Sequence, residues 1–268
     1  MYDQKTMLPA SNAARWQLAL LVVFILVPVA NYLPILLGIS QDAFTRGSST
    51  YVDPAGYAFS IWGLIFIGMI VFAVLQRRVA DPSPDQVSAY RFLVLAGLAS
   101  IAFVPISLGT NYLWGAFDLL WHLFALLAAY FALRRHVRRS ATAPAYGWSY
   151  FAPSAYLGWV SAATVLSIAL ALQQLGVQLS DGRQAIWALA LVLTLTGAGL
   201  YLLSEADGVY ALTVAWALIA IGIEQRDEML VFVAPSAGAV LLLLAVGATR
   251  LNRRPVFYAT DSAAGSTE

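Results

Sequence analysis

Aromatic side chains gather at the start of a long uncharged stretch of the chain, residues 54–76. Tyr57 and Phe59 come first, and Trp62 and Phe66 follow four residues apart. Because residues four apart lie on the same face of a helix, the two large rings share one side. Such rings can stack on a flat apolar ligand, but membrane helices also carry aromatic belts at the lipid–water boundary. This stretch alone favours an aromatic belt, and an aromatic binding site for a flat apolar ligand is the alternative.

Two further segments place tryptophan beside small or polar residues. In the first, Asn111 stands three residues before Trp114. In the second, Tyr156 and Trp159 are followed by Ala163. Ala163 lies one helical turn beyond Trp159 on the same face, where a small side chain leaves room for the edge of a ligand.

Asp118 and His122 form an ionisable pair four residues apart within an apolar region. An acid inside a membrane is costly and is therefore a functional candidate by default. The competing interpretation makes Asp118 the N-cap of a helix that begins there, since aspartate is a preferred cap. We favour the cap, which predicts that Asp118 is no essential proton carrier. His122 is a weak candidate for the axial ligand of a metalloporphyrin.

Asparagine provides the candidate polar anchors of an otherwise apolar site. Ligand pockets are mostly apolar with a few placed polar groups. Asn111 is the first such anchor and Asn31, inside the first apolar run, is the second. Asn31 is alternatively expected to bond to a neighbouring helix.

The chain lacks the residues of most catalytic and metal centres. It has no cysteine and two histidines among 268 residues, which argues against disulfides, thiolate nucleophiles and multi-histidine metal sites. Its net charge of +1 indicates no nucleic-acid-binding surface. No nucleophile–base set or metal motif supports hydrolytic or redox chemistry, so these residues give no positive sign of an enzyme.

The composition is that of a membrane protein. Hydrophobic residues make up 60% of the chain and charged residues 11%, with a mean hydropathy of +0.75. Soluble domains are nearer half apolar and a quarter charged. Since the backbone must satisfy its own hydrogen bonds in lipid, long apolar runs predict an all-α, polytopic transmembrane helix bundle.

The apolar runs predict about eight helices, and the first is expected to remain in the protein because no clear cleavage site precedes it. One run of forty-five residues exceeds a single span and must divide, near Gly109 or near Gly115. The predicted helices are residues 15–38, 54–76, two within 90–134, 151–174, 183–203, 208–223 and 229–250.

Basic residues fall unevenly between alternate loops. If the N-terminus and every second loop share one side, that side holds twelve of the fifteen lysines and arginines. The richer side is the cytoplasm by the positive-inside rule. We therefore expect both termini in the cytoplasm and the aromatic start of residues 54–76 on the outside.

The three aromatic segments resemble those of the translocator protein family, also called tryptophan-rich sensory proteins or peripheral-type benzodiazepine receptors (TspO/MBR). In that family the second helix opens with Pro-Pro-x-Trp-x-Phe and a later Trp. The third carries Asn-x-x-Trp, and the fifth carries Pro-Tyr-x-x-Trp-x-x-x-Ala-Thr. The corresponding segments here read PAGYAFSIW, NYLW and AYLGWVSAAT. The resemblance is closest to longer bacterial members, which implies a bacterial inner (cell) membrane.

The resemblance implies a pocket between the first five helices that binds porphyrins, sterols and synthetic aromatic molecules. A porphyrin or haem would be a ligand there, and no resident cofactor is expected. With Asn31 as an added anchor, the implied ligand-binding residues are Tyr57, Trp62, Phe66, Asn111, Trp114, Tyr156, Trp159 and Ala163.

The chain departs from the family pattern at Ala55, Tyr57, Ala155 and Ser167, where the family has Pro, Trp, Pro and Asn. The resemblance covers roughly the first two-thirds of the chain. We therefore expect a TspO-like five-helix bundle over residues 1–174, an additional three-helix transmembrane segment over 175–254 and a disordered tail over 255–268.

The leading functional hypothesis is a binding and sensory protein for a flat apolar molecule. The last three helices would then serve homodimer formation, signalling or pocket cover. A transporter or channel for a small solute is the alternative, and a tryptophan-dependent porphyrin-degrading enzyme using Trp62 and Trp159 is a minor one. The expected partners are membrane lipid and the apolar ligand, with no nucleic acid.

Overall fold

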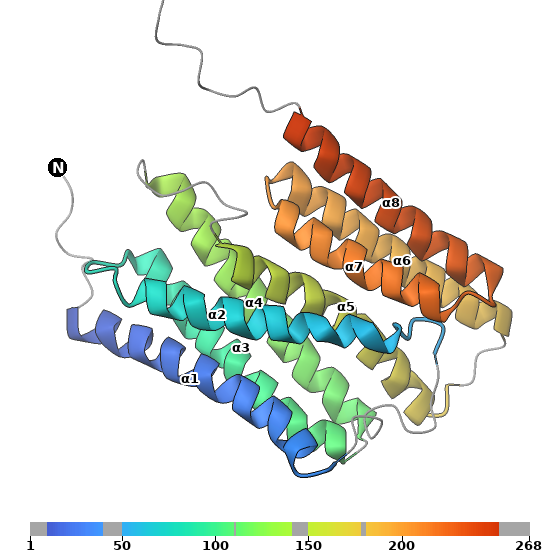
Figure 1. The fold of residues 1–268 in the computed structure, drawn as a ribbon, viewed down its shortest axis with the longest axis horizontal. Helices are drawn as coiled ribbons and strands as arrows, with labels where there is room; N and C mark the ends of the chain where they lie inside the picture. The colour runs from blue at the N-terminus through green and yellow to red at the C-terminus, as the bar shows by residue number, and fades with distance from the viewer. Residues whose placement is uncertain (1–9, 40–49, 110, 141–149, 178–180, 252–268) are drawn as a thin grey trace, which may run out of the picture.

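The computed structural model describes residues 10–39, 50–109, 111–140, 150–177 and 181–251. In this part of the chain the regular structure is entirely helical, which confirms the predicted all-α bundle of eight helices (Figure 1). The elements are α1 (Ala10–Leu36), the 3-10 helix η3 (Gly56–Ser60), α2 (Ile61–Gln76), α3 (Pro84–Leu108), α4 (Tyr112–Arg139), α5 (Phe151–Gln174), α6 (Asp181–Ser204), α7 (Gly208–Glu224) and α8 (Met229–Leu251). Seven spans are long and apolar enough to cross a membrane, and α7 is a shorter apolar helix.

Polar caps set the beginnings of several helices. Ser83 and Gln86 form a reciprocal capping box at the start of α3, which satisfies two backbone N–H groups that the first turn leaves without partners. Asn111 caps α4 by accepting a hydrogen bond from the backbone N–H of Trp114 at 3.2 Å. The long apolar run therefore breaks between Leu108 and Tyr112, at the first of the two predicted places.

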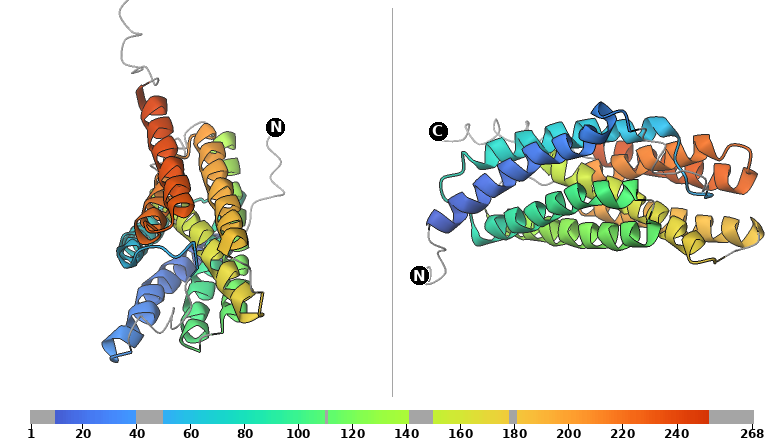
Figure 2. Two further views of the ribbon diagram at one scale, coloured as in Figure 1. Left: turned by 90° about the vertical axis from the view of Figure 1, so that its right-hand side faces the viewer. Right: turned by 90° about the horizontal axis from the view of Figure 1, so that it is seen from below.

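The first five helices close into a ring. Helix α1 packs on α2 and α3, α3 packs on α4, α4 packs on α5, and α5 returns to α2. Figure 2 shows α3 and α4 lying side by side along their lengths. The fully buried rings of Phe24, Tyr90 and Tyr156 come from α1, α3 and α5. Side chains from helices far apart in sequence therefore meet inside this ring.

Helices α6, α7 and α8 pack on one another, and α7 joins them to the ring through α5 and η3. Gly158 of α5 allows a close approach, since a Cβ atom there would lie 2.9 Å from the Thr213 Cβ of α7. Buried apolar residues of α5 and α7 belong to the same core cluster. The C-terminal helices are thus packed directly against the wall of the ring.

Helix α7 also holds the start of α2. The backbone N–H of Ala55 donates to the carbonyl of Ala220 at 3.0 Å. The indole N–H of Trp216 donates to the carbonyl of Ala58 at 3.1 Å, and its ring meets Tyr57 edge-on at 5.2 Å. These contacts fix the aromatic segment that precedes α2.

The segment before η3 is tied to the end of α7 by polar contacts. The side-chain amide of Gln225 donates to the carbonyls of Thr50 and Asp53, at 3.1 and 3.3 Å. The Thr50 hydroxyl donates to the Asp53 carboxylate at 2.7 Å. Burial raises the pKa of Asp53, and the hydrogen bonds from Thr50 oppose that shift.

Ion pairs join α3, α4 and the turn after α6 at the opposite end of the bundle. Arg134 and Arg138 of α4 both pair with Glu205, which follows α6. Arg135 and Arg139 pair with Asp85 of α3 at 3.1 and 2.9 Å. These four arginines of α4 are therefore part of a network that connects α3, α4 and the turn after α6.

Candidate functional site

Five aromatic side chains from η3, α2 and α5 form one cluster on the ring wall, here called the aromatic cluster. Its members are Phe59, Trp62, Phe66, Tyr156 and Trp159. Trp62 stacks on Phe66 with ring centroids 5.1 Å apart and meets Tyr156 and Trp159 edge-on at 5.8 and 6.2 Å. Phe59 lies edge-on to Trp159 at 5.7 Å. Trp62 is thus the common contact of three other members.

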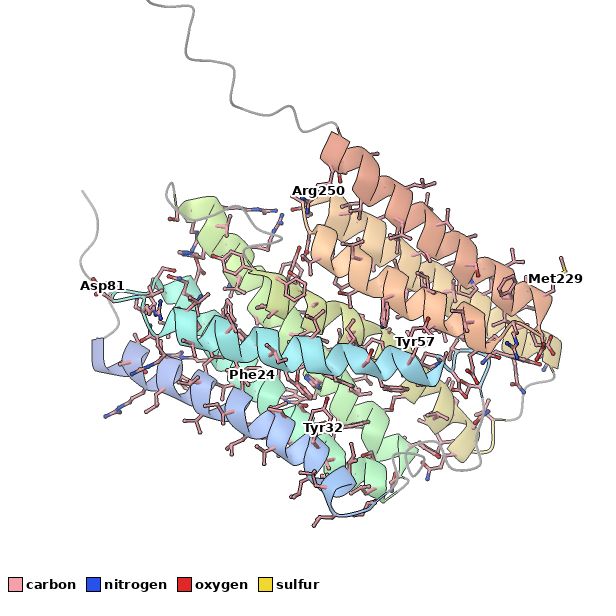
Figure 3. The ribbon with its side chains drawn as sticks, viewed as in Figure 1. Phe24, Tyr32, Tyr57, Asp81, Met229 and Arg250 are labelled. Atoms are coloured by element: carbon pink, nitrogen blue, oxygen red, sulfur yellow. The ribbon has the colours of Figure 1, made fainter. Side chains whose placement is uncertain are left out.

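Helix α1 supplies the next layer of rings around the aromatic cluster. Tyr32 meets Phe66 edge-on at 6.2 Å, and Phe24 meets Tyr156 edge-on at 6.1 Å. Figure 3 shows Phe24 near the middle of α1 and Tyr32 farther along it. Sequence reasoning did not identify Phe24, because one phenylalanine in an apolar helix carries no distinctive spacing.

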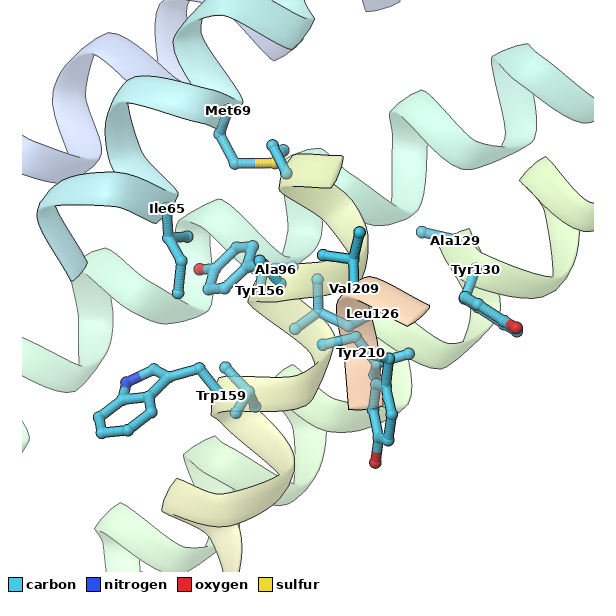
Figure 4. Packing of buried hydrophobic residues seen from close by; sticks show 14 of the residues in the cluster. Ile65, Met69, Ala96, Leu126, Ala129, Tyr130, Tyr156, Trp159, Val209 and Tyr210 are labelled. Carbon is cyan, nitrogen blue, oxygen red and sulfur yellow. The ribbon is translucent and has the colours of Figure 1, made fainter. Parts of the chain in front are cut away.

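Tyr156 and Trp159 are both buried, as is Phe66. Figure 4 shows both side chains projecting from the same side of α5, with Ile65 and Met69 of α2 nearby. Trp159 is 3% exposed, and its indole N–H has no hydrogen-bond partner among the described residues. Because buried polar groups are normally paired, this N–H is available to an acceptor on a ligand.

A line of polar side chains runs beside the aromatic cluster. The side-chain amide of Asn31 donates to the Val27 carbonyl at 2.9 Å and to the Ser100 hydroxyl at 3.4 Å. The Ser100 hydroxyl interacts with the Tyr156 hydroxyl, which lies 2.7 Å from Nε2 of His122. Asn31, Ser100, Tyr156 and His122 thus connect α1, α3, α5 and α4 through the interior of the ring.

Asp118 and His122 lie on α4, whose N-cap is Asn111, so the prediction that Asp118 caps this helix is wrong. Chain geometry explains the outcome, because α3 ends at Leu108 and Asn111 satisfies the first free N–H groups of α4. Asp118 is instead two turns inside the helix. Its Oδ2 and Nδ1 of His122 are both buried without a partner in the described part of the chain.

The other predicted site residues lie apart from the aromatic cluster or at its edge. Asn111 and Trp114, expected on the third helix, both belong to the start of α4. Asn111 is exposed and used as a cap, and Trp114 is 61% exposed beside Phe117. Tyr57 contacts Trp216 of α7 instead of the aromatic cluster. Ala163 is partly buried against the common core, one turn beyond Trp159.

A cavity of about 110 Å³ lies elsewhere, between α5, α6 and the segment before η3. It is lined mainly by apolar side chains, with Thr50 and Gln184 among the polar ones. Pockets for drug-sized ligands measure roughly 300–1,000 Å³. This cavity is therefore too small for a porphyrin or sterol.

The described residues contain no group of three or more His, Asp and Glu side chains able to hold a metal ion. His122 directs Nε2 at Tyr156, so Nδ1 is the nitrogen that remains for a ligand. The arrangement therefore offers aromatic stacking and hydrogen bonding.

Comparison with known proteins agrees with these observations. The family model described as TSPO-like protein matches residues 17–248, which include both the ring and the three C-terminal helices. No curated protein and no solved structure matches the chain. The match spans most of the sequence and confirms the resemblance found in its aromatic segments, and the chain therefore belongs to the TSPO-like family.

Proposed function

We propose that this membrane protein is a receptor that binds a flat, largely apolar molecule, such as a porphyrin or a sterol, inside the ring of α1–α5. The observation that carries the proposal is the convergence of Trp62 and Trp159 from different helices, with the indole N–H of Trp159 buried and without a hydrogen-bond partner in the part of the chain that the structure describes. Aromatic rings stack on flat ligands, and a few polar groups then fix the orientation.

Binding requires the aromatic cluster to open, because its rings pack on one another. Phe59 is 40% exposed and Trp62 is partly exposed, so these two rings are the ones able to change rotamer. A ligand would replace their edge-on contacts with Trp159 by stacking contacts of its own. Ala163 would leave space for the ligand edge one turn farther along α5.

Titration with protoporphyrin IX tests this function in detergent-purified protein. Tryptophan fluorescence should be quenched in a saturable manner, with a dissociation constant below roughly 100 μM, or more than about 5.5 kcal/mol of binding free energy. Trp114→Phe, which changes an exposed indole outside the aromatic cluster, should bind with an unchanged constant. The proposal would be contradicted if quenching rose linearly with porphyrin concentration and equalled the quenching of free N-acetyltryptophanamide in the same detergent.

A transporter is the second candidate, favoured by the polar line from Asn31 to His122 inside the ring. Polar side chains that point into the interior of a transmembrane helix bundle often mark the pathway of a solute. Counterflow in vesicles separates the two functions, because a receptor binds the porphyrin without exchanging it across the membrane.

The orientation proposed with this function places both termini in the cytoplasm. The support is the excess of basic residues at the end of the bundle that carries Arg77, Arg134 and Arg250. Reporter fusions at residue 45, at residue 140 and at the C-terminus check it. Activity of the C-terminal fusion on the outer side only would reverse the assignment.

A further inference from the structure

The half-buried carboxylate of Asp118 lies close enough to Tyr156 of the proposed ligand site to interact with it, and no counter-charge pairs with it among the described residues. Oδ2 of Asp118 is shielded from solvent and has no hydrogen-bond partner among the described residues. Acids inside membranes normally face the bundle interior and pair with another group. Asp118 thus lacks a pairing group among the described residues, and a bound ligand is one group able to supply it.

The described helices supply no cation at this depth. The next arginine along α4 is Arg134, sixteen residues beyond Asp118, or about 24 Å at the helical rise. Arg91 of α3 is nine residues, or about 13 Å, from Ser100, and it lies over the ring of Trp16. Helices α2 and α5 contain neither lysine nor arginine.

His122 provides a second unused group one turn from Asp118. Its Nε2 lies 2.7 Å from the Tyr156 hydroxyl, while Nδ1 is buried without a partner in the same part of the structure. If the imidazole of His122 carries its proton on Nε2, that N–H donates to the Tyr156 hydroxyl and Nδ1 is an acceptor. A carboxylate oxygen and a ring nitrogen then present two acceptors to the same ligand.

Tyr156 links these acceptors to the aromatic cluster. Its ring meets both Trp62 and His122 edge-on, at 5.8 and 5.1 Å. Helices α4 and α5 run in opposite directions, so Asp118 and Trp159 both lie about one turn from the Tyr156–His122 pair, toward the same end of the ring. Aromatic faces attract cations, and this attraction adds to that of the carboxylate.

We infer that Asp118 and His122 form a cation subsite, so that the interior of the helix ring binds flat aromatic molecules with a cationic amino group more tightly than uncharged molecules of the same shape. This inference rests on the proposed function, since the same ring interior holds the flat body of the ligand. Asp118 serves as the counter-ion and His122 Nδ1 accepts a hydrogen bond from the amine. The rings of Trp62 and Trp159 contact the aromatic body.

Two flat three-ring probes test the subsite: 9-aminoacridine, which is a cation at neutral pH, and neutral 9-methylanthracene. The wild-type protein in detergent should bind 9-aminoacridine at least tenfold more tightly, as measured by tryptophan quenching. Asp118→Asn should weaken 9-aminoacridine binding about tenfold or more and leave 9-methylanthracene binding within about twofold. Glu224→Gln, which removes an exposed acid at the end of α7, is the matched control and should retain the preference.

The outcomes separate this inference from the function on which it rests. Equal affinity of the wild-type protein for the two probes, or an unchanged preference in Asp118→Asn, overturns the cation subsite alone. Failure of the wild-type protein to bind either probe also overturns the cation subsite, and the titration with protoporphyrin IX then decides separately whether the proposed function stands. Should Asp118→Asn fail to fold, Asp118→Glu supplies the test, because it keeps the charge and must keep the preference for 9-aminoacridine.

Discussion

Replacing Trp62 by alanine is expected to weaken protoporphyrin IX binding by about tenfold or more. Trp62 is the central ring of the aromatic cluster, with contacts to Phe66, Tyr156 and Trp159. Stacking on one aromatic side chain contributes roughly 1–3 kcal/mol, as measured for nucleic-acid bases. The change in the absorption spectrum of the porphyrin should be used to measure the dissociation constant, because the substitution also removes a fluorophore.

Trp121→Ala is the matched control for this prediction. Trp121 is 49% exposed on the outer face of α4 and packs on Phe124 instead of the aromatic cluster. Its removal deletes a side chain of the same size and should leave the dissociation constant within about twofold. Equal losses of affinity in the two variants would show that the effect is unspecific.

Gly158→Ala is expected to lower the free energy of unfolding by about 1–3 kcal/mol, the usual cost of overpacking. The added Cβ atom would lie 2.9 Å from Thr213 Cβ and 3.2 Å from the backbone oxygen of Tyr210. Thr213 has little freedom to turn away, since its hydroxyl donates to the Val209 carbonyl at 3.0 Å. Relief therefore requires α5 and α7 to move apart, which should lower the melting temperature in detergent.

Gly197→Ala in α6 controls for the general effect of alanine in a helix. A Cβ atom at Gly197 would have no neighbouring atom within 4 Å. Alanine is favoured over glycine in helices by about 1 kcal/mol, so this variant should melt at the same temperature or higher. If both variants melt alike, the close packing of α5 on α7 does not hold the two parts of the chain together.

The helices and part of the site were predictable from the sequence because they depend on local patterns. Long apolar runs predicted eight helices, and the four-residue spacing of Trp62 and Phe66 predicted that both lie on one face, where the structure shows their rings stacked. The resemblance brought Tyr156 and Trp159 into the same proposed site, and the structure places their rings against Trp62.

The missed features depend on contacts that local patterns do not encode. Asn-x-x-Trp fits the interior of a helix and equally fits an N-cap followed by a first turn, and here Asn111 is the cap. That outcome moves Asp118 from a helix boundary into the bundle. Ser100 was not identified, because a single serine in an apolar helix gives no signal until α1 and α5 are seen beside it.

Photo-crosslinking tests the central claim, ligand binding inside the ring of α1–α5, most directly. A diazirine derivative of protoporphyrin IX would be irradiated with the detergent-purified protein, and the labelled residues identified by mass spectrometry. Labels are predicted around the aromatic cluster, within residues 54–76 and 151–163, and an excess of unlabelled porphyrin should suppress them. Suppressible labels confined to α6–α8, or to residues that line the small cavity between α5 and α6, would contradict the account.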